Sequence, residues 1–298
     1  MSEQRTTVLL TGASVGLGLA IARELIASTD YHLILTARGE SLSRFSAEGI
    51  EQSDRVWLRP LDVTNGNERA RLIAEIETHL GGVDMLINNA GIAYRSVIEH
   101  ITDEERRHQM EVNYQAPIAL SRLVMPSMRK KRWGHILQIS SAGGLTAMPT
   151  MGAYAASKFA LEAATEAMYY ELRPFGIRVS LVLPGFLRSD GFEKVLMSEE
   201  SKSASEDENN PYYLHYHHMV GFIARLMRLT PATPKSVAKK VVKTLQARWP
   251  RLRVPATWDT HILWWVRRFV PHRLYVMVTY RLLPGIRKWG RAKDNSRR

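Results

Sequence analysis

The chain of 298 residues contains no cysteine. Disulfide frameworks, thiolate nucleophiles and cysteine-based zinc sites are therefore excluded. It also lacks any uncharged apolar run near the ~18 residues that a transmembrane helix needs. Residues 1–7 lack the apolar stretch of a secretory signal peptide. These absences predict a cytoplasmic protein, and an apolar share of 45% is enough to build a globular core.

Acidic residues are scarce in the last quarter of the chain. Residues 225–298 hold 19 Lys and Arg against two acids, a net charge of +17, while the rest holds 22 bases and 27 acids. A mildly acidic body thus carries a strongly basic tail. This asymmetry predicts a polyanionic partner for the tail, either a nucleic acid or an anionic membrane surface.

Short apolar runs alternate with helix-like segments along the first two-thirds of the chain. The pattern predicts strands at 6–11, 32–37, 55–61, 84–88, 135–140 and 177–183, and helices at 17–28, 68–80, 102–131, 152–174 and 234–247. Such alternation is typical of an α/β fold, in which a doubly wound (Rossmann-type) parallel sheet has helices on both faces. We therefore expect a single domain with a C-terminal helical extension.

The segment 198–210 interrupts this pattern because it is polar, acidic and without large apolar residues. It is predicted to be a solvated loop, or a mobile part of a substrate lid over residues 188–233. Residues 251–254 are predicted to add a short edge strand. The expected division is a catalytic domain at 1–255, containing this lid, and an extension at 256–298.

A glycine-rich turn follows the first predicted strand, with the sequence Thr-Gly-Ala-Ser-Val-Gly-Leu-Gly at 11–18. Between a strand and a helix this pattern is typical of dinucleotide binding. Gly12 permits the tight turn, Gly16 leaves room for a pyrophosphate, and Gly18 lets the helix pack closely on the strand. A merely structural turn remains the alternative.

The second predicted strand ends in Arg38 instead of the acidic residue that would favour NAD. A guanidinium can bind the 2′-phosphate of NADP through paired hydrogen bonds. Arg38 and Ser14 are the candidates for this contact, and an ordinary surface arginine is the alternative.

Tyr154 and Lys158 stand four residues apart in a predicted helix, so they share one helix face. A nearby ammonium stabilises a phenolate and lowers the pKa of a tyrosine that would otherwise be a poor base. Ser141 ends a predicted strand thirteen residues before Tyr154. Parallel sheets bind their ligands at the carboxyl ends of such strands.

Together these motifs resemble the short-chain dehydrogenase/reductase family over about residues 6–187. The match comprises the glycine turn, Asp62, the Asn-Asn-Ala-Gly segment at 88–91, Pro184-Gly185, and the residues Asn113, Ser141, Tyr154 and Lys158. The resemblance implies that Tyr154 donates or accepts a proton, Ser141 holds the substrate oxygen, Lys158 lowers the pKa of Tyr154, and Asn113 orders a water. The substrate contacts are then Ser141 and Tyr154, with Ser140 as the fallback for Ser141.

The same resemblance implies contacts with NADP(H). The residues concerned are Gly12, Ser14, Gly16, Leu17, Gly18, Arg38, Asp62, Val63, Asn89, Ala90, Gly91, Tyr154, Lys158, Pro184, Gly185 and Leu187. Ser189 stands near the place where the family often has a threonine against the nicotinamide amide. The ending and the segment 157–162 are more similar to the steroid and retinol dehydrogenase branch, which implies a lipophilic substrate: steroid, retinoid or 3-keto lipid. A homodimer through 102–131 and 152–174 is expected by resemblance only. A non-catalytic NADP-binding scaffold or redox sensor is the alternative function.

His215, His217 and His218 form a small cluster without further ligands at metal-binding spacing, so no metal site is predicted. They are assigned to a lid surface or to a substrate pocket.

The tail at 258–293 is divided by Pro271 and Pro284 into two short helix-like pieces, rich in aromatic and aliphatic residues beside arginines. Tryptophan and tyrosine beside basic residues are typical of a bilayer interface, and neither piece could span a membrane. The tail is predicted to lie in the plane of an anionic membrane. Packing on the body or on a second subunit is the alternative, and the high apolar content argues against nucleic acid.

Overall fold

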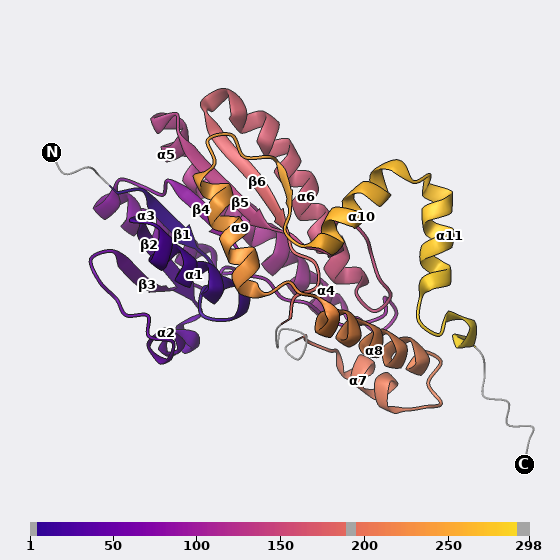
Figure 1. Ribbon diagram of the computed structural model, residues 1–298. Helices are drawn as coiled ribbons and strands as arrows, with labels where there is room; N and C mark the ends of the chain where they lie inside the picture. Colours follow the sequence, from indigo (N-terminus) through magenta and orange to yellow (C-terminus); the bar gives the residue numbers. More distant parts are fainter. Residues whose placement is uncertain (1–4, 189–194, 291–298) are drawn as a thin grey trace, which may run out of the picture.

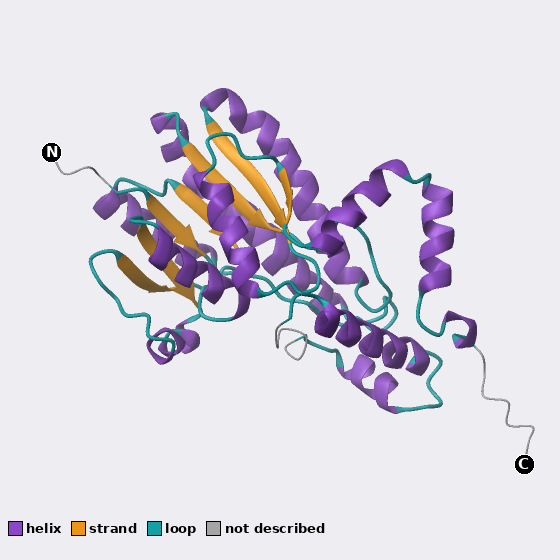
Figure 2. Cartoon of the chain, in the orientation of Figure 1, coloured by secondary structure: helices purple, strands orange, loops and turns teal. Residues whose placement is uncertain are grey.

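The computed structural model describes residues 5–188 and 195–290. Its centre is a sheet of seven parallel strands in the order β3-β2-β1-β4-β5-β6-β7 (Figures 1 and 2). The strands are β1 Thr7–Leu10, β2 His32–Ala37, β3 Val56–Pro60, β4 Met85–Asn88, β5 Gly134–Ile139, β6 Ile177–Leu183 and β7 Arg253–Pro255. The order runs outward in both directions from β1 and β4, so their carboxyl ends form the switch point where doubly wound sheets bind ligands. The predicted fold class is confirmed.

Helices cover both faces of this sheet. Helices α1 (Gly16–Ser28) and α9 (Pro234–Gln246) share one hydrophobic core with one face. Helices α3 (Gly66–Leu80), α5 (Ala116–Lys131) and α6 (Gly152–Leu172) share a second core with the other face. Each helix turns an apolar stripe inward, which is the physical basis of the alternating sequence pattern.

The predicted helix over 102–131 forms as three joined pieces. A capping box between Thr102 and Glu105 starts α4 (Asp103–Met110). The π-helical turn η2 (Glu111–Gln115) follows and leads into α5. Such turns often mark functional sites, and this one carries Asn113.

The prediction of a solvated loop at 198–210 is wrong. Helix α7 (Glu199–Glu206) forms there, and the Ser198 hydroxyl caps it by accepting the Ser201 amide proton. Its buried face is built from small side chains, Ser201 and Ala204, which pack against the buried Tyr216 of α8 (Tyr213–Leu229). A search for large apolar residues misses such a helix.

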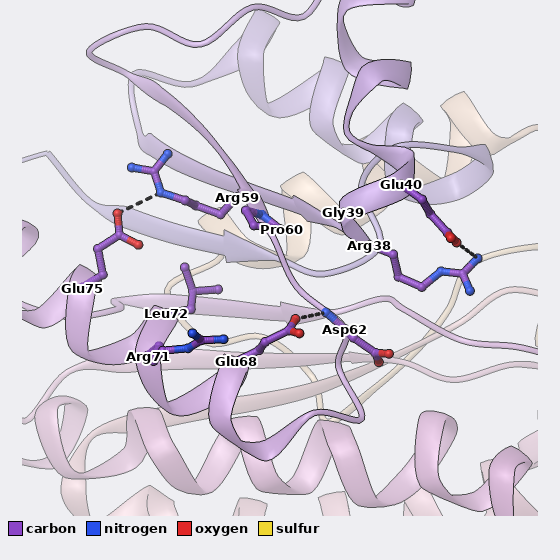
Figure 3. A pocket seen from close by; sticks show the side chains of 10 residues that line it. All are labelled: Arg38, Gly39, Glu40, Arg59, Pro60, Asp62, Glu68, Arg71, Leu72 and Glu75. Carbon is purple, nitrogen blue, oxygen red and sulfur yellow. Dashed lines mark hydrogen bonds and ion pairs between the residues drawn. The ribbon is translucent and has the colours of Figure 1, made fainter.

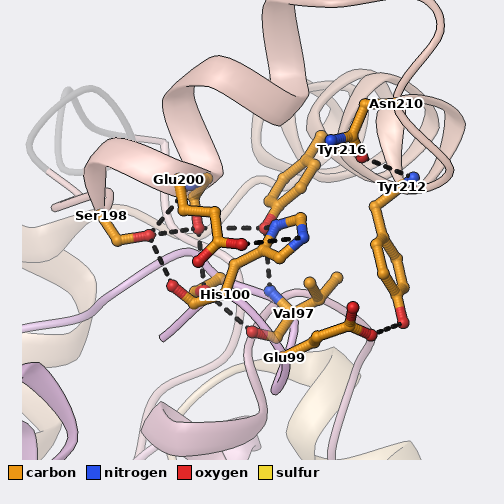
Figure 4. Close-up of polar contacts among 10 residues, drawn as sticks. Val97, Glu99, His100, Ser198, Glu200, Asn210, Tyr212 and Tyr216 are labelled. Atoms are coloured by element: carbon orange, nitrogen blue, oxygen red, sulfur yellow. Dashed lines mark hydrogen bonds and ion pairs between the residues drawn. The ribbon is translucent and has the colours of Figure 1, made fainter. Parts of the chain in front are cut away.

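A buried polar cluster fixes α7 and α8 to the segment after β4 (Figure 4). The Tyr216 hydroxyl donates to Ser201 Oγ over 3.0 Å and accepts from the Val97 amide over 3.1 Å. His100 Nδ1 lies 3.0 Å from the same hydroxyl. The predicted lid region is thus held at its base by hydrogen bonds.

The short elements η1 (Gly39–Ser41), α2 (Ser43–Ala47), η3 (Ala142–Gly144) and η4 (Arg173–Phe175) complete the body. The predicted edge strand is confirmed as β7, two residues later at its start than expected, paired parallel with β6. Beyond it the chain forms α10 (Trp258–Phe269), α11 (His272–Leu282) and η6 (Ile286–Lys288), which we call the C-terminal arch.

The C-terminal arch projects from the sheet and returns toward α8 (Figure 1, yellow). The break between its two helices falls at Pro271, as predicted. Among the described residues, no helix is both long and apolar enough to cross a membrane.

Candidate active site and cofactor cleft

The glycine-rich turn lies between β1 and α1, as the sequence predicts. Gly12 and Gly16 have φ values of +64° and +57°, a region that favours glycine. A Cβ added to Gly18 would lie 2.0 Å from the Gly12 carbonyl oxygen, whereas one at Gly16 would meet nothing within 4 Å. The turn is therefore tight at Gly12 and Gly18 and open at Gly16, a shape that fits a pyrophosphate at a helix N-terminus.

Asn89 braces this turn from the end of β4. Its Nδ2 donates to the carbonyls of Thr11 and Gly12, each over 3.0 Å. The Thr11 hydroxyl accepts from the amides of Asn89 and Ala90 over 3.0 and 3.1 Å. The predicted cofactor residues Asn89 and Ala90 thus hold the backbone that would face the phosphates.

An open cleft of ≈ 610 Å³ lies beside the ends of β2 and β3 and the helix α3, and Arg38 and Asp62 line it (Figure 3). Arg38 is exposed and pairs with Glu40 over 3.2 Å, an exchangeable contact that leaves the guanidinium free to meet a phosphate. Burial opposes ionisation of Asp62, but hydrogen bonds from Thr64 and the charge of Arg38 outweigh it and lower the pKa of Asp62. Ser14 is buried in the glycine-rich turn.

Tyr154 stands in the first turn of α6, and Ser141 at the end of β5. Burial raises the pKa of Tyr154, and a side-chain hydrogen bond with Ser141 opposes that rise. The same Ser141 hydroxyl accepts the Gly143 amide proton over 3.1 Å, which fixes its orientation. Gly143 is needed there because an added Cβ would lie 2.8 Å from the Tyr154 ring.

Lys158 is buried beside Tyr154, with its Nζ 5.9 Å from the centre of the phenol ring. The ammonium donates to the Ile139 carbonyl over 2.9 Å. Burial lowers the pKa of Lys158 to about 8, and the negative charge of Glu162 opposes that lowering. The structure therefore brings Ser141, Tyr154 and Lys158 together at the carboxyl end of β5.

Asn113 is fully buried in the π-helical turn. It exchanges two hydrogen bonds of 2.9 Å with the backbone of Ile92, and its Nδ2 donates to Ser157 Oγ over 3.0 Å. A Cβ added to Gly91 would lie 3.3 Å from Asn113 Oδ1 and 3.8 Å from Lys158 Nζ, so both groups border Gly91.

The two adjacent serines have different partners. Ser140 is buried and donates to Glu162 Oε1 over 2.9 Å, whereas Ser141 Oγ borders Gly143 together with the Tyr154 ring. The geometry therefore favours Ser141 over the fallback Ser140 for a substrate oxygen. Sequence reasoning overlooked Glu162, although an acid four residues after Lys158 in one helix was a usable signal.

The loop after β6 is held by the start of the C-terminal arch. The Gly185 amide donates to Thr257 Oγ1, and the Phe186 amide to Asp259 Oδ2, each over 2.9 Å. The candidate cofactor residues Pro184, Gly185 and Leu187 are described, whereas Ser189 lies outside the described residues. Sequence reasoning gave no role to Thr257 or Asp259.

The histidine cluster belongs to a contact between α8 and the arch. Trp289 Nε1 donates to His218 Nδ1 over 2.9 Å, and the Trp289 ring lies 4.3 Å from that of His215. Among the described residues, no group of three or more His, Cys, Asp or Glu could hold a metal ion.

A family model described as short chain dehydrogenase matches residues 6–200. The chain belongs to the short chain dehydrogenase family. This confirms the predicted resemblance.

Several relatives carry specific names. A 3-ketodihydrosphingosine reductase of Bacteroides thetaiotaomicron is 37% identical over 182 residues, 61% of this chain and 64% of the relative. Retinol dehydrogenase 8 of Bos taurus is 31% identical over 259 residues, 85% of this chain and 82% of the relative. The chain thus spans less than two-thirds of the first relative's length and most of the second's, and its similarity to the retinol branch is confirmed.

Solved structures agree with this assignment. A short-chain dehydrogenase from Streptomyces avermitilis has a TM-score of 0.75 and 31% identity, over 94% of this chain and 96% of that one. A metagenomic short-chain oxidoreductase in complex with NADP has a TM-score of 0.62 and 26% identity, over 85% of this chain and 97% of that one.

Proposed function

We propose that this protein is an NADP(H)-dependent oxidoreductase that interconverts an alcohol and a carbonyl on a lipophilic substrate. The observation that carries the proposal is that the Ser141 hydroxyl and the Tyr154 ring both border Gly143, with buried Lys158 beside Tyr154. These groups stand on the same edge of the sheet as the glycine-rich turn. Hydride and proton chemistry need this adjacency of acid and cofactor.

The cofactor supplies or accepts the hydride when bound, and the chain handles the proton. In reduction, the Tyr154 hydroxyl donates its proton to the substrate oxygen, while the Ser141 hydroxyl donates a hydrogen bond to that oxygen. The Lys158 ammonium stabilises the phenolate that remains. Asn113, fixed by Ile92 and Ser157, keeps the π-helical turn against Lys158 and would order the water that returns a proton.

NADP is preferred to NAD in this proposal because β2 is followed by Arg38 and no acid. A guanidinium–phosphate contact is worth about 1.5–3 kcal/mol, roughly ten- to a hundredfold in affinity. The NADP-bound metagenomic relative supports this preference. Ser14, Leu17, Asp62, Val63 and Gly91 complete the proposed cofactor contacts.

A lipophilic substrate is supported by the names of two relatives, a 3-ketodihydrosphingosine reductase and a retinol dehydrogenase. We retain steroid, retinoid and 3-keto lipid as the candidate classes. The proposed domain division remains 1–255 with a lid at 188–233, followed by the extension at 256–298.

The C-terminal arch is proposed to rest on an anionic membrane surface. Its basic side chains include Arg267, Arg268, Arg273, Arg281, Arg287 and Lys288, and the charge complementarity favours an anionic bilayer over a protein partner. Many of its large apolar side chains are exposed: Trp258, Ile262, Trp265, Phe269, Leu274, Val276, Met277, Val278, Tyr280 and Leu282. Two such signals together suffice for reversible anchoring of a cytoplasmic enzyme.

Vesicle binding tests this surface. Trp265 and Phe269 stack on each other at 5.3 Å and are 56% and 68% exposed. Replacing both by serine is expected to weaken binding to vesicles containing phosphatidylserine by about tenfold or more. Replacing exposed aromatics outside the arch, Trp249 and Tyr170, is the control and should change little. Binding that is equal in all variants, or indifferent to salt, would contradict the proposal.

A homodimer through the regions of α5 and α6 remains a prediction from the resemblance. The alternative function, a scaffold or redox sensor that binds NADP without turnover, is distinguished by one assay. Purified protein is mixed with NADPH and a panel of lipophilic carbonyls, and the loss of NADPH absorbance is followed. Turnover that the Tyr154→Phe variant loses supports the enzyme, whereas binding without turnover on every carbonyl supports the scaffold.

A further inference from the structure

A buried carboxylate lies one helical turn beyond Lys158. The Glu162 side chain is only 7% exposed. Its Oε1 accepts the Ser140 hydroxyl over 2.9 Å, and its Oε2 accepts from Arg253 Nε over 3.1 Å. Burial raises the pKa of Glu162, but its hydrogen bonds with Arg253 and Ser140 and the charge of Lys158 oppose the rise. Burying an acid is costly unless it is paired, so this arrangement holds a charge in place.

Arg253 connects this carboxylate to the far end of the chain. Arg253 lies on β7, and its Nη2 donates to Glu166 Oε2 over 2.7 Å. Its guanidinium also lies 5.7 Å from the centre of the Trp264 ring, on the first helix of the arch. The ion pair therefore fixes Glu162 from the edge of the sheet.

We infer that Glu162 is a positioning residue of the proposed reaction: held by Ser140 and Arg253, it keeps the Lys158 ammonium protonated beside Tyr154. Lys158 is buried, so it would lose its proton readily without a compensating negative charge. Glu162 touches neither substrate nor cofactor in this assignment. Its effect passes through Lys158, and the inference rests on the proposed function.

Few charged groups surround Lys158 among the residues that the structure describes. Helix α6 contributes Glu162 and Glu166, and β7 contributes Arg253. Strand β5 presents the Ile139 carbonyl, and the turn η2 presents the uncharged amide of Asn113. Glu162 is the group whose charge acts on the pKa of Lys158.

The test is the pH profile of carbonyl reduction. Carbonyl reduction needs both the Tyr154 hydroxyl and the Lys158 ammonium in their protonated forms. The first proton that this pair loses as the pH rises therefore sets the alkaline limb of the profile, the range in which the rate falls. Glu162→Gln removes a negative charge, which makes proton loss from either partner easier. The alkaline limb is expected to move to lower pH by about 1 unit or more, because a unit charge within about 10 Å in a medium of effective dielectric constant near 20 shifts a pKa by about that amount.

Two variants make the result specific. Glu166→Gln removes the same charge from the same helix and the same arginine, but one turn further from Lys158 and at a more exposed position. It should leave the limb nearly in place, as should Glu162→Asp, which keeps the charge. Each variant is first checked for its melting temperature and its NADPH dissociation constant.

The inference is supported if only Glu162→Gln moves the limb while its NADPH affinity stays within about threefold of the parent. It is overturned if the three variants share one pH profile, or if Glu162→Asp moves the alkaline limb as far as Glu162→Gln does. It is also overturned if Glu162→Gln unfolds and Glu162→Asp, although folded, shows no turnover. Loss of turnover in Tyr154→Phe would still support the proposed function in each case. A fully active Tyr154→Phe variant would instead remove that function and this inference with it.

Discussion

The cleft around the glycine-rich turn and the C-terminal arch are built on different principles. In the cleft, function rests on backbone shape and fixed spacing: Gly18 packs on Gly12, Asn89 holds the carbonyls of Thr11 and Gly12, and Tyr154 and Lys158 share one helix face. In the arch, a few side chains dock while most large apolar ones face solvent. The cleft therefore tolerates few substitutions that change its backbone shape. The exposed side chains of the arch can be replaced as long as the residues that dock it on the body are kept.

The docking points show that the arch is nevertheless joined to the site. Thr257 and Asp259 hold the loop after β6, and Tyr275 bonds to Thr146, five residues beyond Ser141. Removal of the whole arch would therefore disturb the proposed cofactor site. Point variants separate the two regions better than truncation does.

The largest effect is expected from Gly18→Ala. Its Cβ would lie 2.0 Å from the Gly12 carbonyl oxygen, so the backbone of the turn must shift. We expect about 1–3 kcal/mol loss in the free energy of unfolding and at least a hundredfold weaker NADPH binding by titration. Gly221→Ala is the matched control, because Gly221 lies in α8 with no atom within 4 Å of an added Cβ. Equal behaviour of the two variants would show that the close packing at Gly18 does not limit the shape of the cleft.

A smaller effect is expected from Arg38→Asp, which keeps the shape of the cleft and alters only its charge. The loss of a charge-assisted contact should weaken NADPH binding by about ten- to a hundredfold and leave NADH binding equal or stronger. The two dissociation constants are measured by cofactor fluorescence. Equal affinity of the unaltered protein for both cofactors would count against the role of Arg38.

The smallest effect is expected from Tyr275→Phe in the arch. The Tyr275 hydroxyl lies 2.5 Å from Thr146 Oγ1, and the ring is largely buried. Loss of this bond should cost about 1 kcal/mol and make cleavage of the arch by a protease about fivefold faster. Tyr280→Phe on the same helix, where the side chain is exposed, serves as the control. An unchanged cleavage rate would show that the bond does not hold the arch.

The same contrast explains what the sequence could predict. The strands, the helices on both faces and the glycine turn follow from local patterns of apolar residues and glycines, so they were predictable to within a few residues. The break between α10 and α11 was predictable because proline cannot continue a helix. The placement of Ser141 near Tyr154 and Lys158 was predictable from their spacing together with the family resemblance, since β5 and α6 place them by regular geometry; their roles stay a prediction.

The remaining features depend on contacts between distant parts of the chain. Helix α7 was missed because its inward face consists of Ser201 and Ala204, whose small side chains carry no apolar signal. The cap at Ser198 followed by two glutamates was the available clue. The bonds of Arg253 to Glu162 and of Tyr275 to Thr146 join residues 91 and 129 positions apart, and no local pattern encodes them.

The most direct test of the account is NADPH consumption by purified protein on a lipophilic carbonyl, compared with that of Tyr154→Phe. The substitution removes only the hydroxyl of Tyr154 and keeps the ring beside Gly143 and Lys158. We predict turnover by the unaltered protein and a loss on the order of 10² or more in the variant, with NADPH affinity unchanged. A variant that keeps most of its activity would contradict the assignment of Tyr154 as proton donor and, with it, the proposed function.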